Sequence, residues 1–182
     1  VSFLTTAFHK DRVHFLHDIG LHAIKVGSGE GGQLDLLEEV AKYDWRIFVS
    51  TGLWTQAEMH DALDILDGKD AVLLHTVSEY PATMESANLG RIARLHDATG
   101  LPVGYSDHVA GVDAALAALG MPVPVLEVHH SLPGAPRKMP WDKDMGELAR
   151  IGQFARSVAR MHAPQDTFKS PGEKRPFIGR WQ

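Results

Sequence analysis

The sequence contains the stretch Gly104-Tyr-Ser-Asp-His108 and, further along, Leu126-Glu-Val-His129. Each is a short apolar run, typical of a buried strand, that ends in groups able to bind a metal ion, a phosphate or a carbonyl oxygen. In a barrel of alternating strands and helices, the C-terminal ends of the strands carry the chemistry. The two histidines at the ends of neighbouring strands therefore predict one shared site.

The composition limits the class of protein. The chain has 182 residues, of which 44% are hydrophobic and 23% charged, and this balance is ordinary for a soluble globular domain with a real core. A formal net charge of -5 argues against general binding of nucleic acids, and no apolar stretch approaches the length of a membrane span. The absence of cysteine excludes disulfides and thiolate metal sites. It is compatible with the cytoplasm, where we expect the protein.

Short apolar runs alternate with amphipathic helical patterns along the whole chain. The expected strands cover residues 1–7, 22–27, 46–51, 71–77, 103–106 and 123–129. The expected helices cover residues 10–19, 33–43, 55–66, 84–97, 112–119 and 142–161. Thr55 with Glu58 forms a capping-box pattern, and glycines at positions 20, 68, 100 and 120 stand where helices should end. Six strands alternating with six helices predict an α/β fold with a parallel sheet.

Doubly wound sheets and (β/α)8 barrels share this alternating pattern of strands and helices. The polar groups that follow almost every expected strand distinguish between them. A doubly wound sheet concentrates its ligand groups at one switch point, whereas a barrel draws them from a ring of strand ends. We therefore predict a partial (β/α)8 TIM-type barrel with about six of the eight units over residues 1–162, followed by an irregular tail over 163–182. The sequence opens at Val1, without Met, in an apolar stretch, so we expect that N-terminal strands are missing.

Five motifs, in this order, resemble the signature of the sialic-acid synthase family, which includes related synthases of spore-coat polysaccharide. They are Ile24–Glu30, Val49–Gly52, Leu74–Pro81, Gly104–His108 and Leu126–His129. Members condense phosphoenolpyruvate with an amino-sugar aldehyde. The resemblance, which extends from Val1 to about Lys174, implies the same reaction here, carried out by a carbon–carbon bond-forming transferase that makes a nonulosonic acid and releases phosphate.

The resemblance also implies roles for individual residues. The resemblance assigns substrate binding to Thr6, Lys25, Ser28, Ser50, Ser78, Tyr80 and Ser106. It assigns catalysis to Glu30, Asp107 and His108. His108 and His129 match two histidines of the family that bind a divalent metal, commonly manganese, with magnesium or zinc as alternatives. The implied partners are small molecules, phosphoenolpyruvate and an amino sugar, together with further copies of the chain in a homo-oligomer.

The chemistry of the residues agrees with these roles. A trianionic substrate needs a cation and several neutral donors, and Lys25 with serine hydroxyls and loop N–H groups can supply them. Two imidazoles with open coordination positions suit a metal that acts as a Lewis acid. By contrast, His75 lies inside an expected strand and is interpreted as a core histidine.

The sequence also departs from the family's pattern. The loop over residues 132–140 lacks the family's acid, Val128 stands in place of a basic residue, and His130 replaces an aromatic residue. The family's first two strands and its C-terminal antifreeze-like domain have no counterpart in this sequence. Two alternatives therefore stay open: a noncatalytic fragment that binds a phosphorylated ligand or pairs with a complementary chain, and another phosphoenolpyruvate-dependent aldol condensation.

Overall fold

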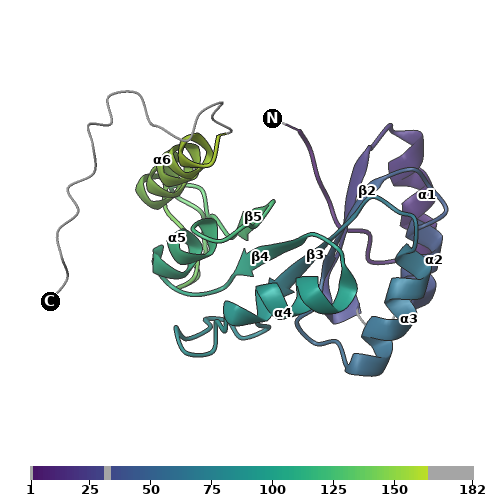
Figure 1. Ribbon diagram of the computed structural model, residues 1–182. Helices are drawn as coiled ribbons and strands as arrows, with labels where there is room; N and C mark the ends of the chain where they lie inside the picture. Colours follow the sequence, from purple (N-terminus) through teal and green to yellow (C-terminus); the bar gives the residue numbers. More distant parts are fainter. Residues whose placement is uncertain (1, 31–33, 164–182) are drawn as a thin grey trace, which may run out of the picture.

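A computed structural model describes residues 2–30 and 34–163, which form a curved parallel sheet with helices outside it (Figure 1). The strands are β1 (Ala23–Val26), β2 (Arg46–Ser50), β3 (Ala71–Thr76), β4 (Val103–Asp107) and β5 (Leu126–Val128). The helices are α1 (Lys10–Asp18), α2 (Leu34–Val40), α3 (Gln56–Leu66), α4 (Gly90–Thr99), α5 (Asp113–Leu119) and α6 (Met145–Met161), with a short 3-10 helix η1 (Ser28–Glu30). The predicted tail after residue 163 and the predicted start of a helix at Gln33 lie outside the described residues.

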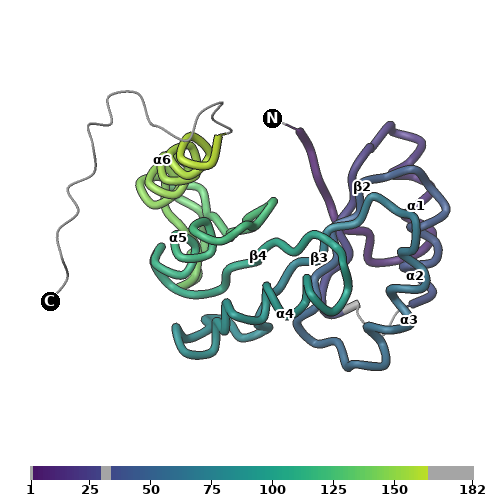
Figure 2. Tube along the Cα trace, in the orientation of Figure 1, coloured from purple at the N-terminus to yellow at the C-terminus, as the bar shows by residue number. Residues whose placement is uncertain are grey.

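The sheet confirms the predicted α/β architecture of a partial barrel. Its strand order is β1-β2-β3-β4-β5, and every neighbouring pair is parallel. The chain passes from each strand through a helix to the adjacent strand, and this path can be followed in Figure 2. The C-terminal ends of all five strands therefore lie at one edge, as the barrel rule requires.

The prediction of a sixth strand over residues 1–7 is wrong for the described part of the chain. Only Thr6 forms an isolated parallel bridge, with Lys25, whose backbone N–H donates to the Thr5 carbonyl at 3.0 Å. Ser2, Phe3 and Leu4 are exposed, so this segment has no packed layer against which a strand could be stabilised. The described sheet consequently has five strands.

The helix predicted over residues 84–97 begins later, at Gly90. Thr83 and Ser86 exchange hydrogen bonds between their hydroxyl groups and backbone N–H groups, each at 3.0 Å. Asn88 then adopts a left-handed backbone conformation with φ of 43°. Hydroxyl side chains that bond to the local backbone compete with helix formation, and a left-handed residue interrupts it. The two effects together explain the delayed start.

Other local predictions are confirmed. The Thr55 hydroxyl accepts a hydrogen bond from the Glu58 backbone N–H at 3.2 Å, and the Glu58 carboxylate accepts one from the Thr55 N–H at 2.7 Å, which completes the capping box of α3. Gly100 caps α4 in the left-handed conformation with φ of 71°. No helix in the described ranges is both long and apolar enough to cross a membrane.

Residues alternate along each strand between the helix layer and the interior of the barrel. On β1 and β2, Ile24, Val26, Ile47 and Val49 are completely buried in the main core. His75 belongs to the buried helix-facing set, and its Nε2 donates to the Ala87 carbonyl at 2.8 Å, which confirms the prediction of a core histidine. The alternate positions face the interior of the barrel, and these carry the site.

Candidate active site

A cavity of about 210 Å³ lies at the C-terminal ends of the strands. It is lined by Lys25, Gly27, Ser28, Gly29, Ser50, Thr76, Tyr80, Ser106, His108, Glu127 and His129. Every strand contributes at least one of these residues, either from its last positions or from the loop that follows. The arrangement matches the catalytic end of a barrel.

The two charged side chains of the cavity come from the two edge strands of the sheet. Lys25 on β1 and Glu127 on β5 form an ion pair, with Nζ 3.1 Å from Oε1. Their meeting shows that the sheet curves strongly enough to bring its first and last strands together across the interior. The second oxygen of Glu127, Oε2, is buried without a hydrogen-bond partner among the described residues. The sequence marked Glu127 as a polar strand end, and its alternation with His129 was the signal that could have assigned it to the site.

Serine hydroxyl groups line the same cavity as Lys25. The Ser50 hydroxyl is buried and has no hydrogen-bond partner within the described residues, so it is available to a ligand. Ser28 lines the cavity, and its hydroxyl oxygen lies 3.1 Å from that of Ser78, which is not itself a lining residue. Thr6 is not among the lining residues, although its backbone bridge to Lys25 holds it next to the site.

The rings of His108 and His129 lie next to each other, with centroids 5.1 Å apart and planes inclined at 62°. The Nδ1 of His108 donates to the Val77 carbonyl at 2.6 Å, because a carbonyl oxygen can only accept, and this leaves Nε2 with a free lone pair. Burial lowers the pKa of His108, with a smaller contribution in the same direction from His129, so its ring is neutral at neutral pH. A neutral imidazole fixed through its other nitrogen is the usual form of a metal ligand.

His108 and His129 are the two residues of this cavity that could hold a divalent ion, and two imidazole ligands would leave its other positions open to water or substrate oxygens. No third histidine, aspartate or glutamate joins them in a three-ligand group within the described ranges.

Aromatic rings cluster around Tyr80, which lines the cavity. The ring of Tyr80 lies 4.1 Å from that of His108 and 5.3 Å from that of Trp141, measured between centroids. Burial, together with the nearby negative charge of Glu127, raises the pKa of Tyr80. The sequence predicted Tyr80 as a site residue. Trp141, which packs beside Tyr80 without lining the cavity, was not predicted because it follows a long irregular loop and belongs to no strand end.

The remaining two predicted acids are not brought into the cavity by any described contact. Asp107 alternates with Ser106 and His108 along β4, and its side chain is completely buried on the other side of the strand. Its carboxylate accepts hydrogen bonds from the Tyr105 hydroxyl at 3.1 Å and the Val109 N–H at 3.0 Å. The side chain of Glu30 lies outside the described part of the chain.

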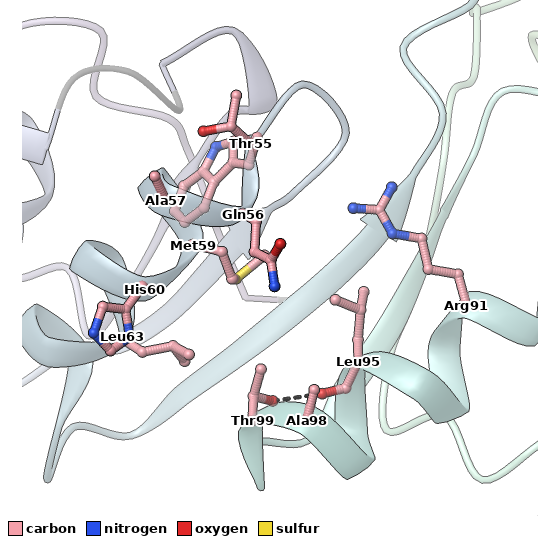
Figure 3. Close-up of a pocket in the computed structure, with 11 residues that line it drawn as sticks. Thr55, Gln56, Ala57, Met59, His60, Leu63, Arg91, Leu95, Ala98 and Thr99 are labelled. Atoms are coloured by element: carbon pink, nitrogen blue, oxygen red, sulfur yellow. Dashed lines mark hydrogen bonds between the residues drawn. The ribbon is translucent and has the colours of Figure 1, made fainter.

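A larger hollow, of about 770 Å³, lies between α3 and α4 in the outer layer (Figure 3). Its lining is mostly apolar and includes Met59, Leu63 and Leu95. We place the site in the smaller cavity, because there the cation, the hydroxyl groups and the paired imidazoles converge at the strand ends.

Comparison with known proteins gives the family. The model of the NeuB family matches residues 1–159. The chain belongs to the NeuB family. This confirms the relationship that the five motifs predicted.

Relatives of this NeuB-family chain include two N,N'-diacetyllegionaminic acid synthases. The protein from Campylobacter jejuni is 38% identical over 137 residues, which are 72% of this chain and 41% of the relative. The protein from Legionella pneumophila is 31% identical over 187 aligned residues, covering 97% of this chain and 50% of the relative. The chain thus spans about half the length of these relatives, or less.

Solved structures of other proteins have the same fold as this chain. The N-acetylneuraminic acid synthetase of Leptospira borgpetersenii, in complex with citrate, superposes with a TM-score of 0.81 at 25% identity and covers 92% of this chain and 60% of that one. A spore coat polysaccharide biosynthesis protein from Bacillus subtilis superposes with a TM-score of 0.79 at 27% identity, covering 88% and 47%.

Proposed function

We propose that this chain carries the substrate site of a nonulosonic acid synthase. In this reaction phosphoenolpyruvate condenses with an amino-sugar aldehyde and phosphate is released. The observation that carries the proposal is the convergence of one lysine, serine hydroxyls and two neighbouring histidines at the C-terminal strand ends. The synthases named among the NeuB-family relatives support the class of product.

Lys25, Ser28 and Ser50 hold the phosphate and carboxylate groups of phosphoenolpyruvate. The ammonium group of Lys25 supplies the charge, and the Ser50 hydroxyl supplies a donor that has no partner in the described part of the chain. Charge-assisted hydrogen bonds of this kind are about twice as strong as neutral ones. Ser78 keeps Ser28 in position through the contact between their hydroxyl groups.

His108 and His129 are the residues that would hold a divalent metal, for which we propose manganese. When bound, such an ion acts as a Lewis acid toward the aldehyde oxygen of the sugar. The chain's own contribution is to fix the His108 ring through Val77 and to present its free Nε2 to the cavity. Tyr80 flanks the histidines and borders the space left for the sugar.

Phosphate release tests the proposal. The chain is incubated with phosphoenolpyruvate, Mn²⁺ and a panel of amino-sugar aldehydes, and inorganic phosphate is measured. We expect release that depends on both sugar and metal and is abolished in His129→Gln. The matched control is His60→Gln, which changes a histidine on the outer helix α3.

Binding of phosphoenolpyruvate without phosphate release would favour the noncatalytic fragment. Release supported only by phosphorylated aldoses would favour a condensation that makes sugar-acid phosphates.

We further propose that the chain works in the cytoplasm as a homo-oligomer. Phe3, Leu4 and Phe8 precede the edge strand β1 and are exposed. Exposed apolar side chains beside a sheet edge that is covered by a single bridge, at Thr6, favour association. Light scattering of the purified chain tests this, and a monodisperse monomer would contradict it.

A further inference from the structure

Lys143 is a completely buried lysine in the segment that leads into α6, where it forms an isolated parallel bridge with His130. Its ammonium nitrogen lies 2.9 Å from Oδ2 of Asp107, which is also completely buried. The same nitrogen donates to the carbonyl of Val109. Lys143 is thereby attached to the end of β4 on both sides of His108.

The backbone of Lys143 is attached to the end of β5. Its N–H donates to the carbonyl of His129 at 2.8 Å. Its own carbonyl accepts from Nδ1 of His130 at 2.7 Å. One residue therefore connects the strand end that carries His108 with the strand end that carries His129.

Stability alone does not require an ion pair at this position. Removing a lysine and an aspartate from water is costly, and apolar side chains of similar volume often stabilise a fold as well or better. What Lys143 supplies is a fixed position: its ammonium group is paired with the Asp107 carboxylate and donates a hydrogen bond to the Val109 carbonyl, while its backbone is bonded at the end of β5. Few arrangements of the two strand ends satisfy all of these contacts.

We propose that Lys143 is a positioning residue that sets the separation and orientation of His108 and His129. The inference rests on the proposed function in that these histidines are the proposed metal ligands. Lys143 does not line the cavity, and within the described residues it acts through Asp107, the carbonyls of Val109 and His129, and the side chain of His130.

The test uses the double variant Lys143→Met, Asp107→Asn. Changing Lys143 alone would leave a buried carboxylate uncompensated and could prevent folding, whereas the double variant removes both charges together. The control Lys10→Met breaks an exposed ion pair with Asp35, 2.7 Å long, on the outer face of the fold.

The first measurement is Mn²⁺ affinity, from the signal of free Mn²⁺ in electron paramagnetic resonance. Loss of groups that orient metal ligands typically costs 10- to 100-fold in affinity, and we expect a loss of about that size in the double variant and none in Lys10→Met. Circular dichroism and thermal unfolding confirm that both variants are folded.

The second measurement needs no metal. Imidazole nitrogen resonances of the metal-free chain report the tautomer and environment of each ring, and those of His129 and His108 should shift in the double variant but not in the control. A folded double variant with the wild-type Mn²⁺ affinity and unmoved resonances would overturn the proposal. If the wild-type chain binds no Mn²⁺, the proposed metal role fails, and the resonances still decide whether Lys143 positions the rings.

Discussion

Replacing Lys25 by methionine removes the single lysine or arginine that lines the cavity among the described residues, while keeping the apolar stem. A charge-assisted hydrogen bond contributes about 1.5 to 3 kcal/mol. At 1.4 kcal/mol per factor of ten, the affinity for phosphoenolpyruvate should fall roughly 10- to 150-fold. The upper part of this range is expected, because Glu127 would lose its partner and its negative charge would then oppose the anion.

Isothermal titration of phosphoenolpyruvate into wild type and Lys25→Met measures this effect. The matched control is Arg46→Met, which removes a cation from the opposite end of the neighbouring strand β2, where Arg46 pairs with Asp70 at 2.8 Å. That ion pair is more than half exposed, so its loss should change the free energy of unfolding by less than about 1 kcal/mol and leave ligand affinity unchanged. Equal affinity of wild type and Lys25→Met would exclude Lys25 from the anion site and refute the reasoning.

Three further predictions concern stability. Gly104→Ala should destabilise the fold by about 1 to 3 kcal/mol in urea unfolding, because a Cβ there would lie 2.6 Å from the Val125 carbonyl oxygen. As a control, Gly152→Ala in the middle of α6, where a Cβ meets no close contact, should stabilise the fold by up to about 1 kcal/mol. Thr55→Ala should cost about 1 kcal/mol in the same assay through loss of the capping box, and an unchanged midpoint would contradict this. Burial lowers the pKa of His75 in the folded chain. Below about pH 6.5 the unfolded chain therefore binds more protons than the folded chain, and the free energy of unfolding decreases as the pH is lowered. Thermal unfolding across this range should show a weaker pH dependence for His75→Leu, and equal slopes would count against the interpretation.

Local patterns in the sequence were sufficient for the alternating architecture. The spacing of apolar residues predicted strands β1 to β5 and the helices between them, and the capping box at Thr55 predicted the start of α3. These features depend on backbone periodicity and on contacts within a few residues, so a short stretch of sequence is enough to predict them. Barrel topology then predicted that Lys25, Ser50 and His108 would meet, because parallel strands present their C-terminal ends at one edge.

Only the tertiary structure decided which side chain meets which. The contact between Lys25 and Glu127 depends on the curvature of the sheet, since the two residues stand on its opposite edges. Asp107 was predicted to be catalytic but is paired with Lys143, a residue distant in sequence whose burial no local pattern reveals. The N-terminal segment has strand-forming residues yet makes one bridge, at Thr6, because a strand needs a neighbour and a packed face as well as propensity. Burial and long-range pairing are properties of the assembled fold, so they settled where the charged groups of the site lie.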